Sequence, residues 1–207
     1  MKGGAPKEVP SGDIPSYRNK TMPRIDDIED TPNPNAKKFV LKEPLTWGIA
    51  HSYDNAGQAL GDALGEALFQ IEHVTSVFYV HNWITVTQDG GADWRDLSRQ
   101  LAEPIRAAPG AGERSAQLAF GAAAGDAEVA PEDQERLGIF NTLLDEQVRP
   151  YLQGDGGDLH VLSLKGNLLT VHYQGACGSC PSSISGTLAG IEGLLRTVEP
   201  DIEVMAV

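Results

Sequence analysis

The sequence predicts an α/β (α+β) protein made of two small domains joined by a flexible linker. Runs rich in Val, Ile, Thr and aromatic residues alternate with segments whose apolar residues recur at helical spacing. This alternation occupies residues 31–107 and again residues 131–207, whereas residues 108–130 are mostly Ala, Gly, Ser and isolated charges. Residues 1–30 mix Gly, Pro and charge without sustained periodicity, so we expect a disordered tail there.

Residues 31–35, with the sequence TPNPN, open the first domain. Each proline fixes its own φ angle and pushes the preceding residue toward extended backbone, which favours a stiff lead-in. We interpret this segment as a turn that delivers the chain into a strand at residues 38–41, with a binding role as the less favoured alternative. A second short strand is expected at residues 46–50.

A helix capped by Asp54 or Asn55 is expected next, because apolar residues up to about Gln70 repeat every three or four positions. A hairpin with strands at residues 74–80 and 83–88 follows, since β-branched and aromatic residues dominate both arms.

A second helix, capped by Asp93, should end near Ala107, which gives the order β-(β)-α-β-β-α. The histidines of this domain, at which we expect only solvated or capping roles, are His51, His73 and His81. The domain contains no cysteine and no Gly-rich phosphate loop, so by itself it indicates no chemistry.

The second domain should begin with a helix at Pro131, because proline followed by two acidic residues is typical of a helix N-terminus. Helical spacing continues to Tyr151, and Pro150 is expected to end the regular pattern. A loop with three glycines at residues 153–158 then leads into a hairpin whose two-residue turn is Gly166-Asn167. The register of that hairpin sets Leu164 opposite Leu169 and Leu162 opposite Val171, and these four residues are predicted to face the core.

The last helix is predicted to begin at Pro181 and to stop at Pro200, before a short final strand at residues 202–206. The domain order is therefore α-β-β-α-β. The apolar stripe of this helix consists of Ile184, Leu188, Ile191, Leu195 and Val198.

The only two cysteines, Cys177 and Cys180, lie between the predicted strand and this helix, in a segment of residues 175–180 that we call the cysteine loop. A helix N-terminus lowers the pKa of a thiol, and the thiolate is the form that binds metal. Gly178 would let the loop curl so that both sulfurs face one ion. The positions expected to support the two ligands are Gly175, Ala176, Gly178, Ser179 and Pro181.

Two sulfurs are too few for a tetrahedral zinc site or an iron–sulfur cluster, each of which takes four protein ligands. A twofold dimer would supply the missing pair, so we favour a metal centre shared between two subunits. The alternatives are a thiol–disulfide oxidoreductase and two structural cysteines in a turn. Spare ligands nearby are His160 and His172, at which a ligand role is not favoured.

Composition excludes several partner classes. The formal net charge of −13 would repel polyanions, so we expect neither nucleic acid nor an anionic membrane as partner. The first residues lack an apolar h-region and are too acidic for a transit peptide, so we expect neither kind of targeting segment. Two cysteines make no disulfide framework, which favours a reducing cytoplasm.

Several segments resemble the NifU-like (Nfu-type) iron–sulfur proteins. In the second domain they are residues 155–158 (DGGD), 175–183 (GACGSCPSS) and 187–192 (TLAGIE). The first domain resembles the N-terminal domain of many members through residues 31–39 (TPNPNAKKF), 71–78 (IEHVTSVF) and 84–87 (ITVT).

The resemblance implies a scaffold or carrier without catalytic activity. It would hold a labile [4Fe-4S] cluster (alternatively [2Fe-2S]) between two subunits and pass it to apo-proteins. Cys177 and Cys180 match the cluster ligands of the family. The implied partners are a second copy of the chain when the cluster is bound, apo iron–sulfur clients, and upstream cluster-assembly proteins. The cytoplasm is the expected location, with the mitochondrial matrix, for a mature form, as the alternative.

Overall fold

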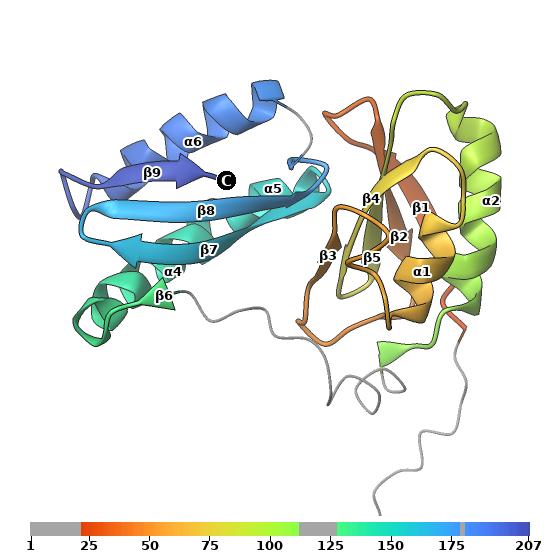
Figure 1. The fold of residues 1–207 in the computed structure, drawn as a ribbon, viewed down its shortest axis with the longest axis horizontal. Helices are drawn as coiled ribbons and strands as arrows, with labels where there is room; N and C mark the ends of the chain where they lie inside the picture. The colour runs from red at the N-terminus through yellow and green to blue at the C-terminus, as the bar shows by residue number, and fades with distance from the viewer. Residues whose placement is uncertain (1–21, 112–127, 179–180) are drawn as a thin grey trace, which may run out of the picture.

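The computed structural model describes residues 22–111, 128–178 and 181–207. It confirms the predicted class, a mixed α+β fold in two domains (Figure 1). The N-terminal domain is one five-stranded antiparallel sheet with the strand order β1-β2-β5-β4-β3. Its strands are β1 (Ile25–Asp30), β2 (Ala36–Leu41), β3 (His51–Tyr53), β4 (Val74–Val80) and β5 (Trp83–Gln88).

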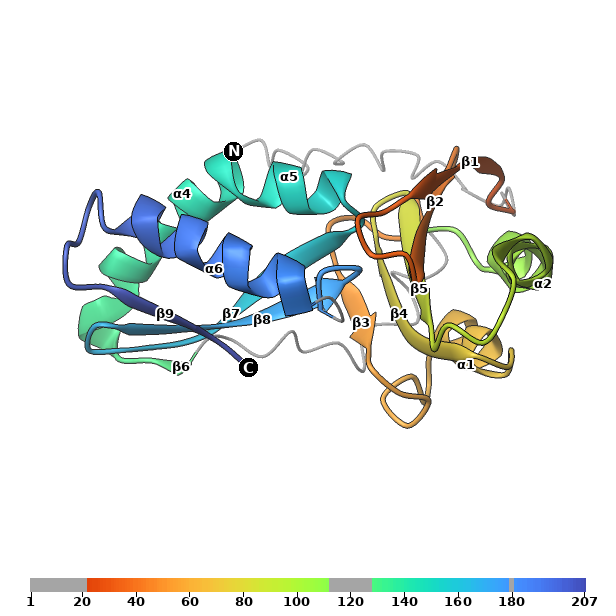
Figure 2. The ribbon, with the colours of Figure 1, turned by 90° about the horizontal axis from the view of Figure 1, so that it is seen from above.

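Helices α1 (Ala63–Phe69) and α2 (Trp94–Ala107) lie on the side of this sheet away from the second domain (Figure 2). The core between sheet and helices is apolar, and its largest members are Phe39, Tyr79, Leu41, Ile84, Leu97 and Leu101. The hairpin of β4 and β5 has the predicted bounds, and the Asp93 side chain caps α2 as predicted by accepting from Arg95 N at 2.8 Å.

Strand β1 lies where the sequence predicted the end of a disordered tail, so that prediction is wrong for residues 25–30. The strand is acidic and mostly exposed, so its sequence lacks the alternation of apolar and polar residues that would predict a strand. It pairs with the basic strand β2. The Oε2 atom of Glu29 lies 3.0 Å from Lys38 Nζ, and the side chain of Asp30 forms an ion pair with Lys37. Charge complementarity across the ladder therefore replaces apolar alternation at this edge.

The helix predicted from residue 54 exists only in its second half, since α1 begins at Ala63 with Asp62 as its cap. Gly61 has φ +91°, which is incompatible with a right-handed helix, and glycine weakens helices in any case. The short strand predicted at residues 46–50 is displaced to β3.

One histidine differs from the sequence prediction. His51 is buried, and its ring stacks on Tyr79 with 4.6 Å between centroids. His73 and His81 lie at turns with positive φ, as their predicted positions at strand and turn edges suggest.

The C-terminal domain packs two layers, a four-stranded sheet and a layer of helices (Figure 2). The sheet order is β6-β7-β8-β9, with parallel outer pairs and an antiparallel central hairpin. The strands are β6 (Glu128–Val129), β7 (Gly157–Lys165), β8 (Leu168–Gly175) and β9 (Glu203–Ala206). The helices are the 3-10 turn η2 (Pro131–Asp133), α4 (Gln134–Gln147), α5 (Arg149–Gly154) and α6 (Pro181–Leu195).

A β-bulge changes the predicted register of the central hairpin. Leu164 pairs with Leu169 as predicted, but Val171 pairs with Val161, so Leu162 is the extra residue of the bulge. Leu162 is therefore 37% exposed, whereas Val161 is 4% exposed and takes its place in the core. A two-residue turn and strict alternation cannot reveal a bulge several residues away.

Three further boundaries differ from the sequence prediction. Strand β6 lies inside the predicted linker, most of which (residues 112–127) is outside the described residues. Pro150 lies in the first turn of α5, which begins at Arg149, and does not end the helical region, because proline fits the first turn of a helix. Helix α6 begins at Pro181 as predicted but ends at Leu195, so Val198 is exposed.

Candidate functional site

The cysteine loop joins β8 to α6 at the end of the C-terminal domain that faces the N-terminal sheet (Figure 1). Its first part is a tight turn, in which Gly178 N donates to Gly175 O at 3.1 Å. Cys177 lies inside this turn, and Pro181 is the first residue of α6. The other two predicted loop residues, Ser179 and Cys180, lie outside the described residues.

The thiol of Cys177 points into the C-terminal domain. The residue is only 7% exposed and belongs to the same apolar cluster as Tyr173 and Leu159. A Cβ atom at Gly157 would lie 2.7 Å from Cys177 Sγ, so the absence of a side chain at Gly157 makes room for the thiol. In this conformation Cys177 is sheltered, and a metal could reach it only after the loop turned outward.

Backbone crowding explains the glycines of the loop. Gly175 has φ +67°, and a Cβ there would lie 2.5 Å from Gly156 O. A Cβ at Gly178 would lie 2.9 Å from Tyr173 O. The loop therefore closes through backbone contacts that any larger residue would disturb.

Tyr173 lies beneath the loop, and its hydroxyl has no hydrogen-bond partner among the described residues. Burial raises the pKa of Tyr173 well above its ordinary value, and the nearby Cys177 thiolate raises it further. The phenol is thus neutral near pH 7.

Among the described residues, neither of the two histidines considered as spare ligands, His160 and His172, forms a metal-binding group with Cys177. His172 Nδ1 lies 2.7 Å from Val207 O, and its Nε2 lies 3.9 Å from Asp54 of the N-terminal domain. Within residues 22–111, 128–178 and 181–207, no group of three or more His, Cys, Asp or Glu side chains could hold a metal ion. The described residues alone therefore do not complete a metal site around Cys177.

Sequence reasoning missed the residues that the N-terminal domain brings to this end of the second domain. Asn33 Nδ2 donates to Ala176 O at 3.2 Å, and Thr85 Oγ1 donates to Gly156 O at 2.6 Å. Asn33 belongs to the TPNPN segment, in which the structure shows the predicted turn, whereas a binding role for the segment stays a prediction. Thr85 gave no signal, because a threonine in a strand is ordinary.

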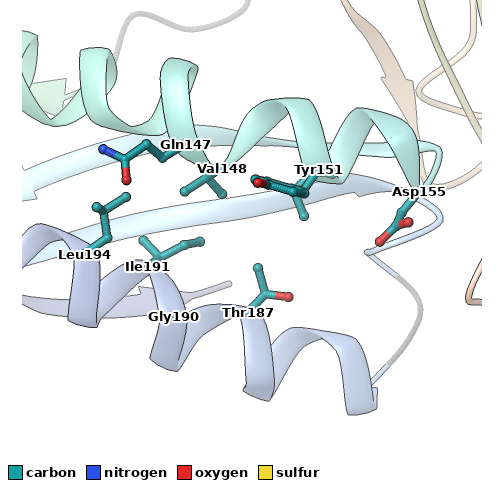
Figure 3. Close-up of a pocket in the computed structure, with 9 residues that line it drawn as sticks. Gln147, Val148, Tyr151, Asp155, Thr187, Gly190, Ile191 and Leu194 are labelled. Atoms are coloured by element: carbon teal, nitrogen blue, oxygen red, sulfur yellow. The ribbon is translucent and has the colours of Figure 1, made fainter.

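A pocket of about 350 Å³ lies between α5 and α6, near the loop (Figure 3). Its walls are mainly apolar side chains, with Asp155 and Thr187 at one end. Cys177, the cysteine that the structure describes, is not among the residues that line it. Among the described helices, none is both long and apolar enough to cross a bilayer.

Both domains of the chain match families of known proteins. Residues 25–110 match the family model for the N-terminal domain of the scaffold protein Nfu/NifU, and residues 141–205 match the NifU-like domain. The chain is 31% identical over 176 residues to the NFU1 iron-sulfur cluster scaffold homolog, mitochondrial, of Drosophila ananassae, covering 84% of the chain and 61% of the relative. The Drosophila willistoni protein of the same name is also 31% identical, with 84% and 60% covered. The chain thus spans about 60% of the length of these curated relatives.

Solved structures show weaker likenesses. The NMR structure of a NifU-like protein from Saccharomyces cerevisiae is 20% identical with a TM-score of 0.37, covering 58% of this chain and 94% of that one. The crystal structure of protein SAV1430 from Staphylococcus aureus is 23% identical with a TM-score of 0.35, covering 40% and 98%. Because both TM-scores are low, the assignment depends on the sequence matches. With an Nfu/NifU N-terminal domain followed by a NifU-like domain, the chain belongs to the NifU-like (Nfu-type) family of iron–sulfur cluster scaffold proteins.

Proposed function

We propose that this protein carries a labile [4Fe-4S] cluster, bound by Cys177 and Cys180 of two subunits, and transfers it to apo-proteins. The observation that carries the proposal is the placement of the chain's only two cysteines between a strand end and a helix start, in a NifU-like domain. Thiolate is the usual protein ligand of iron in such clusters. The donor type therefore fits the cargo.

The ligand count supports sharing between subunits. A cubane cluster takes four protein ligands, and one chain has two cysteines. His172 interacts with Val207 and Asp54, so it does not extend the set in this conformation. A twofold pair of chains would bring four thiolates to one axis. A [2Fe-2S] cluster has the same ligand requirement and is the alternative cargo.

The loop suits release better than permanent storage. Bulky neighbours and hydrogen bonds to the sulfurs would hold a cluster tightly, but the loop consists of glycine, alanine and serine around the cysteines. A client thiolate could then bind an iron as Cys177 or Cys180 leaves it, a ligand exchange that changes no oxidation state. The protein would act as a carrier without enzymatic turnover.

Membership of the family supports the proposed partners and location. Apo iron–sulfur clients would receive the cluster and upstream assembly proteins would supply it, with the N-terminal domain as the part that recruits them. The relatives are named mitochondrial, which favours the matrix over the cytoplasm that composition suggested.

Anaerobic reconstitution with iron and sulfide tests the proposal. We expect about four irons and four sulfides per two chains, together with a dimer mass in solution. Cys177→Ala and Cys180→Ala should each lose nearly all bound iron while keeping the wild-type circular dichroism. Ser163→Ala, a similarly small change on β7, is the control that should bind as wild type.

The alternative function, thiol–disulfide exchange, predicts different results. A thiol–disulfide oxidoreductase would be a metal-free monomer that cycles between dithiol and disulfide. A stoichiometric cluster in Cys177→Ala, or a colourless monomer under strict anaerobiosis, would disprove the carrier proposal.

A further inference from the structure

The face of the N-terminal sheet that points away from α1 and α2 is buried. Phe78, Val80 and Trp83 form an apolar cluster on it, separate from the main core, and none of the three is more than 7% exposed. An antiparallel sheet covered on one side by helices usually exposes its other side to water. Here the ends of β7 and β8 cover that side (Figure 2).

Two glycines of the C-terminal domain make the closest approach. Both Gly156 and Gly175 have positive φ angles. A Cβ at Gly156 would lie 2.9 Å from Thr85 Oγ1, and a Cβ at Gly175 would lie 3.1 Å from Phe78 Cδ1. A side chain at either position would press against the N-terminal domain, so the observed closeness of the two domains depends on these glycines.

Three hydrogen bonds between described residues cross the contact, each from an N-terminal side chain to a C-terminal carbonyl oxygen. Asn33, Thr85 and Lys38 of the N-terminal domain donate to the carbonyl oxygens of Ala176, Gly156 and Gly154 at 3.2, 2.6 and 3.4 Å. Glycine and alanine offer nothing but backbone groups to a partner, and their carbonyls are what the N-terminal side chains bind. Thr85 is 1% exposed and Asn33 is 6% exposed, so both donors are buried together with their acceptors.

Lys38 closes the edge of the contact. Its Nζ lies 5.4 Å from the ring centre of Trp83 and 3.0 Å from Glu29. The ammonium group is thereby held over the same face that receives the loops. We call Asn33, Lys38, Phe78, Trp83 and Thr85 the docking face.

We propose that the docking face is a binding site for residues 175–178 of the cysteine loop and for the neighbouring glycine turn (residues 154–157) of the same chain, and that docking excludes sharing of the loop with a second subunit. Asn33 holds the carbonyl of Ala176, the residue directly before Cys177. In the docked state the Cys177 thiol points inward, with 7% exposure. A second chain would have to reach this same end of β8, where the N-terminal domain already lies.

Docking then controls how much of the protein can take up a cluster. Only undocked chains can bind a cluster. The apparent affinity for the cluster is therefore reduced in proportion as the undocked fraction becomes smaller. The competition half of this inference rests on the proposed function, whereas the docking half does not. The two halves therefore need separate measurements.

Amide hydrogen exchange in the metal-free full chain tests the docking. In Thr85→Val the bond to Gly156 O is lost without a change of shape, and peptides covering residues 31–35 and 173–178 should exchange about fivefold faster, as a loss of ~1 kcal/mol gives. Thr87→Val is the matched control on the same strand and face, because Thr87 is equally buried but its hydroxyl has no hydrogen-bond partner among the described residues. Unchanged exchange in Thr85→Val, or equal acceleration in both variants, overturns the docking; exchange in α2 checks that each variant is folded.

The rate of cluster uptake during anaerobic reconstitution tests the competition. Thr85→Val should load about fivefold faster than the wild type and than Thr87→Val. If Thr85→Val opens the loop but loads at the wild-type rate, the competition is wrong and the docking stands. If no variant, including the wild type, takes up iron and sulfide, the proposed function fails, while hydrogen exchange still decides the docking.

Discussion

The two domains contribute different kinds of groups to the contact between them. The N-terminal domain has a core with Phe39 and Tyr79 at its centre, and it presents side-chain donors on its outer face. The C-terminal domain carries the thiols in a loop that offers a partner almost nothing but backbone. Strong donors built into the thiol-bearing domain would be fixed beside the cluster permanently. Donors on a separate domain can leave, so the division allows the same loop to be held or released.

The largest effects should separate the two cores. Phe39→Ala in β2 and Phe140→Ala in α4 each empty a site that is at most 1% exposed, so each should cost about 3–5 kcal/mol of its own domain's stability. Urea unfolding of the full chain should show Phe39→Ala shifting one transition and Phe140→Ala another. Only Phe140→Ala should lower the amount of iron bound at saturation, because the cysteine loop belongs to its core. A single transition that moves equally in both variants would mean that the domains fold as one unit.

Much of the fold could be predicted because apolar periodicity is local. The β4–β5 hairpin, α2 with its Asp93 cap and the start of α6 each depend on residues within one element. Strand β1 and the bulge at Leu162 depend on a partner strand, whose charge or register a single segment does not contain. The spacing between Cys177 and Cys180 predicts Cys177 as a candidate ligand. The donors that meet its loop could not be predicted, since Asn33 contacts a residue 143 positions away.

A smaller effect on stability should follow from placing a side chain at Gly157, next to the thiol of Cys177. In Gly157→Ala the new Cβ would lie 2.7 Å from both Cys177 Sγ and Gln174 O, so the loop or the strand must move. We expect a loss of about 1–3 kcal/mol of C-terminal stability. Because the displaced thiol must turn outward, alkylation of Cys177 in the apoprotein should also become faster. Mass spectrometry of alkylated peptides measures that rate residue by residue.

Gly154→Ala is the comparison for this substitution. Gly154 is at the end of α5, and a Cβ there would meet nothing within 4 Å among the described residues. Its stability and its alkylation rate at Cys177 should stay near the wild-type values. Faster alkylation in both variants would show that the inward position of the thiol does not depend on Gly157.

The smallest effect concerns the buried phenol under the loop. Tyr173→Phe removes a hydroxyl that has no hydrogen-bond partner among the described residues, so stability at neutral pH should stay the same or rise by up to ~1 kcal/mol. The pKa of Tyr173 is raised by burial and by Cys177, so its contribution to stability is complete below the unfolded pKa of about 10 and is lost as the pH rises above it. The wild-type C-terminal transition should therefore weaken above about pH 10, and Tyr173→Phe should lose part of that weakening. Tyr151 is 75% exposed, so Tyr151→Phe should keep the full loss of stability at alkaline pH. Equal dependence of stability on alkaline pH in the two variants would show that Tyr173 does not cause this loss.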